Sequence, residues 1–410
     1  MPDLTDPADL GFDGDRLERI GAFLEKAYVG SGRLPNTQIL VARDGKPVYR
    51  HRAGVQNEAG DPLREDALFR IASMTKPVTS IAFMQLVEQC KVALDDPISR
   101  VLPEFASPGV YSGGGGSIPF APTTPARPIR FVDLLTHTAG LTYGLQNRTN
   151  VDAAYREANL DLPRNLSSDD YVARLAKLPL QHAPGERWTY SVATDVLGVA
   201  VERLSGQKLG DYFRDHIFGP LGMDDTGFDL PDGSRARLSD NWAWSPNGKP
   251  SLIERGTHSA HFTPAGFHSG GGGLASSIED YHRFCTMLLQ RGALDGRRII
   301  APKTLALMTA NHLPGGADLT AVSDALFSEA SNAGTGFGLG FACVIDPVAT
   351  LMPASRGEYY WGGAFSTAFF VDPVERVTMV FMTQLYPSNI YPLRRQLKTM
   401  IYAALSESHA

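Results

Sequence analysis

Residues 69–80 of the chain read Phe69-Arg70-Ile71-Ala72-Ser73-Met74-Thr75-Lys76-Pro77-Val78-Thr79-Ser80. Residues three positions apart on a helix lie on one face, so Ser73 and Lys76 can bring a hydroxyl and an amine close enough to share a proton. Pro77 has no backbone N–H and is tolerated only in the first turn of a helix. The stretch therefore predicts a helix that begins near Ser73.

The segment that follows Pro77 predicts a helix buried on all sides. Its apolar residues surround the helix rather than forming a stripe, and they are Val78, Ile81, Ala82, Phe83, Met84, Leu86, Val87 and Cys90. A lysine at the start of such a helix is partly desolvated and can serve as a base. The positive end of the helix dipole favours negative charge on the serine oxygen or on an oxyanion beside it. These features indicate a nucleophilic serine.

A second serine and lysine three positions apart shows why context matters. Ser205 and Lys208 have the same spacing, but Gly206 separates them and Gly210 follows. This pattern is typical of a turn between two helices. We therefore expect Ser205 to take no part in the chemistry.

The composition is that of an ordinary globular protein. The 410 residues are 43% hydrophobic and 20% charged, enough chain for two subdomains around a sizeable core. The net charge of −6, without a block of lysine and arginine, argues against nucleic acid or an anionic membrane as the main partner. No apolar run approaches the length of a membrane span.

The amino terminus and the cysteines bear on the cellular compartment. Residues 1–15 are acidic and rich in proline and glycine, without the basic start and apolar run of a secretory signal, so we expect a cytoplasmic protein. Cys90, Cys285 and Cys343 are odd in number, far apart and set in apolar surroundings. They predict buried free thiols rather than disulfides or a metal site.

The two ends of the chain predict a single antiparallel sheet. Residues 37–42 and 47–53 have the composition of strands around a turn at Asp44-Gly45, and residues 366–371 and 376–384 predict a second hairpin. Apolar spacing predicts helices over 17–29 and 392–405. We therefore expect an α+β fold in which the sheet is flanked by the terminal helices.

The middle of the chain predicts mostly helices and loops. Residues 1–85 and 275–410 would form the sheet domain and residues 86–274 the helical domain, with the active site in the cleft between them. Helices are predicted over 132–135, 168–178, 191–204 and 210–218. Of the two tetraglycine runs, 113–116 predicts an exposed loop, and for 270–273 we favour a flexible connection over a close backbone approach.

Tyr190 is a further candidate site residue. It lies in the sequence Trp188-Thr189-Tyr190-Ser191-Val192, where a helix is predicted to begin. A tyrosine at such a boundary is usually a packing residue. Beside Ser73 and Lys76, however, its phenol could pass the serine proton to a leaving group.

The order of several motifs resembles that of the serine β-lactamase-like superfamily, and more narrowly of the family VIII carboxylesterases related to class C β-lactamases. The motifs are Ser73-Met74-Thr75-Lys76, Leu134-Leu135-Thr136-His137-Thr138-Ala139-Gly140-Leu141, Tyr190-Ser191-Val192, Gly271-Gly272-Gly273-Leu274 and Trp361-Gly362-Gly363. The resemblance runs from about Leu17 to the last helix.

This resemblance implies a role for each motif. Ser73 would be the acylated nucleophile, Lys76 its base and Tyr190 the proton relay, although the roles of Lys76 and Tyr190 can be exchanged or shared. The backbone N–H groups of Ser73 and Ala364 would form the oxyanion hole. The Trp361-Gly362-Gly363 segment matches the position of the Lys-Thr-Gly motif on the strand that lines the cleft, so these three residues would bind the substrate. Structurally, Gly362 and Gly363 need be no more than a strand bulge.

Two departures from the superfamily pattern bear on the substrate. Trp361 replaces the cation of the Lys-Thr-Gly motif, which binds a carboxylate in β-lactamases and penicillin-binding proteins. Val192 replaces the asparagine of Tyr-x-Asn, whose amide binds an acylamino group. Both changes exchange polar recognition for apolar surface, so a neutral ester with a small acyl group fits better than a penicillin.

Other chemistries have weaker support. The chain has no Gly-x-Ser-x-Gly motif, and His258, His261 and His268 have a loose metal-ligand spacing without His-Glu-x-x-His. His137 could pair with a serine, but its threonine neighbours suggest a structural turn. No cofactor is implied.

Carboxylester hydrolysis is therefore the predicted activity. An acyltransferase, a β-lactamase or D-amino-acid peptidase, and a catalytically silent ligand-binding protein of the same fold remain alternatives. The oligomeric state stays open.

Overall fold

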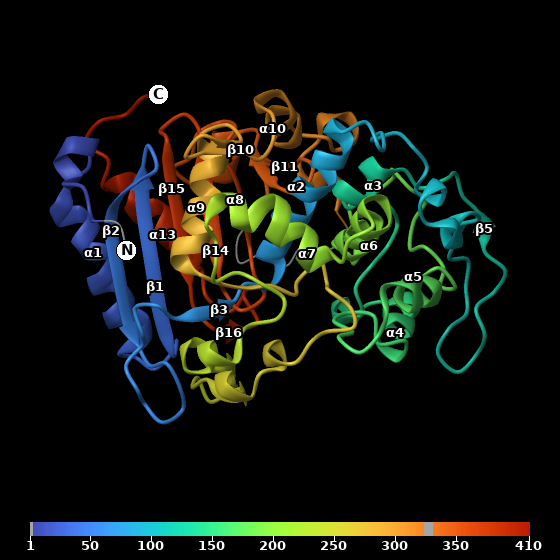
Figure 1. Ribbon diagram of the computed structural model, residues 1–410, viewed down its shortest axis with the longest axis horizontal. Helices are drawn as coiled ribbons and strands as arrows, with labels where there is room; N and C mark the ends of the chain where they lie inside the picture. Colours follow the sequence, from blue (N-terminus) through green and yellow to red (C-terminus); the bar gives the residue numbers. More distant parts are fainter. Residues whose placement is uncertain (1–2, 324–330) are drawn as a thin grey trace.

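A seven-stranded antiparallel sheet organises the computed structural model, which describes residues 3–323 and 331–410 (Figure 1). The strand order is β11-β12-β13-β14-β15-β1-β2, so the amino-terminal hairpin extends a sheet built from the carboxyl-terminal part of the chain. The strands are β1 (Asn36–Arg43), β2 (Lys46–Gly54), β11 (Thr335–Phe337), β12 (Ala342–Val344), β13 (Tyr359–Gly362), β14 (Ala368–Asp372) and β15 (Val377–Met382).

Helices cover both faces of this sheet, because successive side chains of a strand point to opposite sides. Ile39 and Val41 of β1 pack with the terminal helices α1 (Gly14–Leu24) and α13 (Leu393–Ala403). Leu40 and Ala42 belong to the larger core, which includes α2 (Thr75–Glu88) and α9 (Ile278–Leu289). The α+β sheet flanked by terminal helices is thus confirmed.

The middle of the chain combines helices with long loops, and most of it lies in the right-hand part of Figure 1. Its helices are α3 (Phe131–Leu135), α4 (Asn150–Glu157), α5 (Ser168–Leu175), α6 (Ala193–Ser205), α7 (Leu209–Phe213) and α8 (Gly219–Leu221). The predicted helices near 132–135, 168–178, 191–204 and 210–218 are confirmed. Ser205 ends α6, Gly206 takes a φ of 74° and Lys208 precedes α7, as expected of a turn.

One three-stranded and three two-stranded sheets accompany the large sheet in the described part of the chain, and two of them join segments that are far apart in sequence. The strands are β3 (Leu68–Arg70) with β8 (Ala275–Ser277), β6 (Asn241–Ala243) with β7 (Ser251–Glu254) and β16 (Leu385–Tyr386), β4 (Gly109–Val110) with β5 (Thr124–Pro125), and β9 (Ala293–Leu294) with β10 (Arg297–Arg298). Because β6 pairs with β16, the later middle segment is bonded to the carboxyl-terminal region. The domain boundaries stay a prediction.

Three further α-helices of the described part of the chain lie between α9 and β13 in sequence. They are α10 (Pro302–Met308), α11 (Leu319–Val322) and α12 (Pro347–Thr350).

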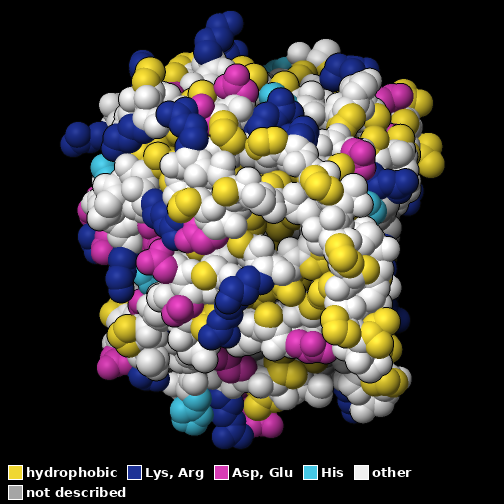
Figure 2. Space-filling view, turned by 90° about the vertical axis from the view of Figure 1, so that its right-hand side faces the viewer, with side chains coloured by type: hydrophobic (Ala, Val, Ile, Leu, Met, Phe, Trp, Pro, Cys, Tyr) yellow, Lys and Arg dark blue, Asp and Glu magenta, His cyan; other side chains and the backbone are white. Residues whose placement is uncertain are grey.

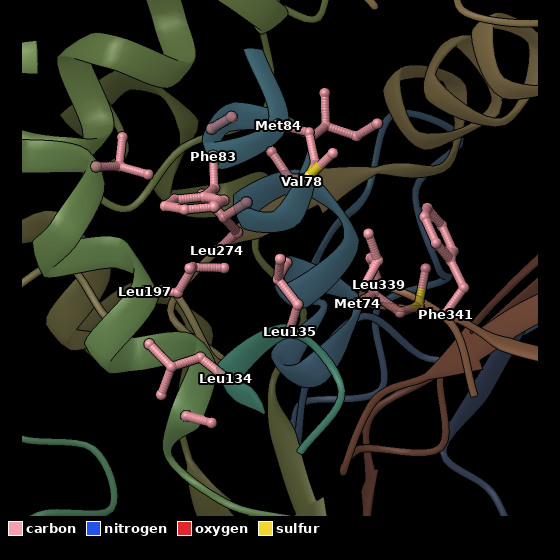
Figure 3. Packing of buried hydrophobic residues seen from close by; sticks show 14 of the residues in the cluster. Met74, Val78, Phe83, Met84, Leu134, Leu135, Leu197, Leu274, Leu339 and Phe341 are labelled. Carbon is pink, nitrogen blue, oxygen red and sulfur yellow. The ribbon is translucent and has the colours of Figure 1, made fainter. Parts of the chain in front are cut away.

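Helix α2 lies at the centre of the larger core. Every residue from Thr75 to Leu86 is buried, as the all-round apolar pattern predicts. Figure 3 shows Val78, Phe83 and Met84 among side chains from other elements, including Leu134, Leu197 and Phe341. This packing fixes the start of α2, and therefore Ser73, against both parts of the fold.

The prediction of three buried thiols is wrong for Cys90. Cys285 and Cys343 are buried, but Cys90 is exposed. The helix ends at Glu88, and Cys90 takes a φ of 56° in the turn that follows, so it no longer continues the helical pattern.

The surface carries mixed charge. On the face shown in Figure 2, lysine and arginine side chains lie among aspartate and glutamate, with hydrophobic side chains between them. No helix within residues 3–323 and 331–410 has the length and apolar character needed to cross a membrane.

Candidate active site

Ser73 lies in a single 3-10 turn, Ala72–Met74, that leads directly into α2. Pro77 is the third residue of α2, so it occupies the first turn as predicted. Ala72 has a φ of 44°, a left-handed conformation that costs about 1–3 kcal/mol for a residue with a side chain. Such strain persists only where neighbouring contacts hold the backbone in place.

The turn before α2 is held against the loop after β13. Thr367 Oγ1, from that loop, donates to Ile71 O at 3.4 Å. The N–H of Ile71 donates to a different segment, at Leu274 O directly before β8, at 3.0 Å. A Cβ atom built on Gly363 would lie 2.5 Å from Ile71 O. Glycine is therefore required at position 363 because two backbone segments meet there, a stronger constraint than the strand bulge considered from the sequence.

Ser73, Lys76 and Tyr190 come together as predicted. The Tyr190 hydroxyl donates to Ser73 Oγ at 2.6 Å, and Lys76 Nζ donates to the same oxygen at 3.3 Å. Lys76 Nζ also lies 4.7 Å from the centre of the Tyr190 ring. A serine hydroxyl with two proton-exchanging partners at hydrogen-bond distance is the arrangement that nucleophilic catalysis needs.

Lys76 has two further partners that the sequence did not suggest. Its Nζ donates to Tyr143 Oη at 3.0 Å and to Gly271 O at 2.6 Å, while only 1% of the residue is exposed. A carbonyl can only accept, so Gly271 always takes one N–H. An ammonium group on Lys76 can donate one N–H to each of Gly271 O, Tyr143 Oη and Ser73 Oγ. A neutral amine can donate to Gly271 O and one hydroxyl and accept from the other hydroxyl, so the three contacts suit either form. Burial raises the pKa of Tyr143 well above its usual value, so this hydroxyl remains neutral.

Asp195 holds Gly271 in position. Its Oδ1 accepts from the Gly271 N–H at 3.0 Å and from Ser269 Oγ at 2.5 Å. Burial raises the pKa of Asp195, while the charge of Lys76 opposes that shift. The flexible connection favoured for residues 270–273 is wrong: Gly270 and Gly271 are buried, and their backbone passes close to the lysine.

We expect Gly271→Ala to lower both turnover and stability. A Cβ atom there would lie 2.3 Å from Asp195 Oδ2 and 3.0 Å from Tyr143 Oη, so the backbone must shift and carry Gly271 O away from Lys76. A displacement of about 1 Å in such a site costs roughly 100-fold in rate. Kinetics and thermal unfolding would measure both effects.

Gly233→Ala is the matched control, because a Cβ at Gly233 would meet no atom within 4 Å and its φ is not positive. It should leave turnover and the melting temperature unchanged. Wild-type turnover in Gly271→Ala would contradict the role given to this carbonyl.

His137 serves the packing of the site rather than pairing with Ser73. Its Nδ1 lies 3.1 Å from Ser191 Oγ, and its ring packs 5.1 Å from that of Tyr190. Burial, followed by the charge of Lys76, lowers the pKa of His137 well below its usual value. A neutral ring buried against Tyr190 agrees with the structural reading of this motif.

Of the three histidines with loose metal-ligand spacing, His268 and His261 are held by other contacts, and His258 is exposed. His268 stacks on Phe228 with ring centres 4.6 Å apart, and His261 Nε2 lies 3.2 Å from Gly273 O. Burial lowers the pKa of His261 to about 4. Within the described residues, no cluster of three or more His, Cys, Asp or Glu side chains could hold a metal ion.

Ser73 opens into a cavity of about 730 Å³, large enough for a drug-sized molecule. Its lining includes Ser73, Tyr143, Tyr190, Trp361, Gly362, Gly363 and Ala364. The Trp361 ring packs 5.6 Å from that of Tyr190, so it forms an aromatic wall beside the serine. Among the described residues, no acceptor takes a hydrogen bond from the Ala364 N–H, which leaves a backbone donor at this cavity.

Val192 does not line the cavity, so the prediction that it offers apolar surface to the substrate is wrong. The residue is fully buried in the larger core, directly before α6. Its side chain is turned into the protein, and the change from a polar residue therefore affects packing.

Arg394, at the start of α13, supports the loop after β13. Its Nη2 donates to Gly363 O at 3.2 Å and to Thr367 O at 3.4 Å. A Cβ on Gly362 would lie 2.6 Å from Arg394 Cζ, so the guanidinium packs directly on this glycine. The Gly363 carbonyl and the Ala364 N–H belong to the same peptide unit, so the hydrogen bond from Arg394 also holds this N–H in place.

Comparison with known proteins places the chain in a family. The pattern of the family described as Beta-lactamase matches residues 22–398. Protein Rv1367c of Mycobacterium tuberculosis is 38% identical over 362 residues, which cover 87% of each protein. Esterase EstB of Burkholderia gladioli is 33% identical over 416 residues, covering 97% of this chain and 98% of the esterase.

A solved structure supports the same placement. The structure described as EstCE1, a hydrolase with promiscuous acyltransferase activity, superimposes with a TM-score of 0.76 at 26% identity, covering 96% of this chain and 98% of that one. These similarities confirm the serine β-lactamase and penicillin-binding-protein fold predicted from the order of the motifs. The chain belongs to the beta-lactamase family.

Proposed function

We propose that the protein is a serine carboxylesterase that cleaves neutral esters through an acyl-enzyme on Ser73. The observation that carries the proposal is the position of Ser73 Oγ, 2.6 Å from the Tyr190 hydroxyl and 3.3 Å from Lys76 Nζ, in the lining of a cavity large enough for a substrate. Similarity to an esterase at 33% identity adds support.

The proposed reaction has two stages. Ser73 Oγ attacks the ester carbonyl while its proton passes to Lys76 or Tyr190, and the Ser73 and Ala364 N–H groups bind the oxyanion. The bond from the carbonyl carbon to the alcohol oxygen then breaks, and the alcohol leaves with the proton. Water, deprotonated by the same groups, attacks the acyl-enzyme and releases the acid and Ser73. No step needs a cofactor.

Trp361 supports a neutral ester with a small acyl group. Its ring stands beside Tyr190 where β-lactamases and penicillin-binding proteins carry a cation for a carboxylate. An acyl group that lay against this aromatic wall would gain apolar contact without an ionic partner. For the same reason, β-lactam and D-amino-acid peptide substrates are disfavoured.

Acyl transfer to an alcohol is the second candidate function. The structurally similar EstCE1 is described as a hydrolase with promiscuous acyltransferase activity. Both reactions share the acyl-enzyme and differ in whether water or an alcohol attacks it. Adding acceptor alcohols during ester turnover and quantifying the new ester would distinguish them.

The test of the main proposal is covalent trapping. The protein is treated with a phosphonate ester that reacts with serine nucleophiles, then analysed by intact mass and peptide mapping, while chromogenic esters and a chromogenic cephalosporin are assayed in parallel. We expect one adduct per chain on Ser73 and faster turnover of esters than of the cephalosporin. No adduct and no turnover would favour a silent ligand-binding protein.

A further inference from the structure

Four exposed hydrophobic side chains line the cavity that contains Ser73. They are Leu145, Leu162, Ile253 and Tyr386, with exposed fractions of 42%, 60%, 52% and 40%. Large apolar side chains in contact with water at a cavity often mark a binding surface. Because these four both line the cavity and reach solvent, we call them the apolar mouth.

The apolar mouth is assembled from separate parts of the fold. Leu145 and Leu162 come from the helical part, where Asp161 Oδ1 accepts from the Gly144 N–H at 2.7 Å and so fixes the two short segments against each other. Ile253 lies in β7 and Tyr386 in β16, the two outer strands of one three-stranded sheet. Each side of the mouth therefore has its own hydrogen-bonded support.

Both sides of the mouth reach the proposed reacting centre. Gly272 lies next to both Leu162 and Ala72, the residue before Ser73: a Cβ built on Gly272 would lie 3.5 Å from Leu162 Cδ2 and 3.9 Å from Ala72 C. Leu162 is therefore close to the turn that carries Ser73. On the other side, the Tyr386 ring packs 6.3 Å from that of Phe365, the residue after Ala364. A group bound between them would lie just outside the ester carbonyl.

Several charged residues of the cavity lining are engaged with the protein itself. Asp161 accepts from the Gly144 N–H, Lys398 Nζ lies 2.5 Å from Glu358 Oε1, and Arg394 donates to Gly363 O. These contacts reduce the capacity of the lining to bind a charged ligand. Arg395 also lines the cavity and is exposed, but the side chains of the mouth offer apolar surface, apart from the Tyr386 hydroxyl.

We infer that the alcohol half of the substrate is a bulky apolar group held by the apolar mouth. This inference rests on the proposed esterase function. The proposed function places the small acyl group against Trp361, so the alcohol half is the part of the ester that is left to occupy the apolar mouth. Contact with Leu162 and Ile253 removes apolar area from water and favours hexyl or phenylethyl alcohols over ethanol.

Acetate esters of primary alcohols test the inference, because their leaving groups have similar basicity. We expect kcat/KM to rise from ethyl to hexyl and 2-phenylethyl acetate. Leu162→Ser and Ile253→Ser should each lower kcat/KM for hexyl acetate by about 5- to 10-fold more than for ethyl acetate, as half-burial of such a side chain implies. Leu307→Ser is the matched control, since Leu307 is 43% exposed and lies outside the cavity lining.

The outcomes separate this inference from the proposed function. Equal loss for hexyl and ethyl acetate, or the same loss in Leu307→Ser, would overturn the inference while leaving the esterase intact. A selective loss for ethyl hexanoate instead of hexyl acetate would show that the mouth holds the acyl half, and would refute the assignment to the alcohol. No hydrolysis of any ester and no acyl-enzyme would refute the proposed function itself.

Discussion

Ser73→Ala is expected to abolish ester hydrolysis and covalent labelling while leaving the fold intact. The substitution removes only the hydroxyl, which accepts hydrogen bonds from Tyr190 and Lys76. Without it, no oxygen remains at this position to attack the ester carbonyl. In hydrolases whose nucleophile and base act as a unit, such a change lowers kcat by about 10⁴- to 10⁶-fold. Measuring kcat and the mass of the phosphonate-treated protein would check this expectation.

Ser205→Ala provides an internal control with the same local sequence spacing. Ser205 ends α6, where its hydroxyl lies 3.4 Å from Glu202 O and accepts from the Gln207 N–H at 3.2 Å. We expect wild-type kcat in this variant, with full phosphonate labelling. Labelling that persists in Ser73→Ala, or disappears in Ser205→Ala, would assign the nucleophile to a different residue. Unchanged thermal unfolding would show that Ser73→Ala acts on chemistry rather than folding.

The elements that could be predicted from the sequence are those with a local signal. The all-round apolar pattern of α2, the apolar run Ile39–Ala42 of β1 and the turn at Asp44-Gly45 can each be recognised within a short stretch of sequence. The terminal helices and hairpins were placed correctly for this reason. Their union into one sheet followed because each hairpin had an apolar face to bury.

The contacts missed by sequence analysis depend on tertiary structure. Tyr143 bonds to Lys76 and Asp195 bonds to Gly271, in both cases across dozens of residues, and neither residue belongs to a sequence pattern that indicates its contact. A run of four glycines signals flexibility and close approach equally, and only the position of Lys76 decides between them at Gly271. The orientation of Val192 likewise depends on how α6 packs. Tyr143 could have been suspected, since it lies two residues after the Leu134–Leu141 motif.

The division of proton transfer between Lys76 and Tyr190 leads to the second large expected effect. Tyr190→Phe removes one hydroxyl and keeps the ring that packs against Trp361 and His137. Lys76→Met removes the amine and keeps most of the side-chain volume within the buried site. Each variant should lose about 10²- to 10⁴-fold in kcat, as expected when a group that transfers a proton is removed.

Leaving-group chemistry distinguishes the two roles. A p-nitrophenyl ester releases an anion that needs no proton at neutral pH, whereas an alkyl ester releases an alkoxide that must be protonated. If Lys76 takes the proton from Ser73 and Tyr190 protonates the leaving group, Lys76→Met slows both esters equally, and Tyr190→Phe slows ethyl acetate far more than p-nitrophenyl acetate. The opposite pattern would exchange the roles: the phenolic oxygen of Tyr190, which lies 2.6 Å from Ser73 Oγ, would then accept the serine proton, and Lys76 would protonate the leaving group. Near-normal hydrolysis of ethyl acetate by either variant would remove that residue from the mechanism.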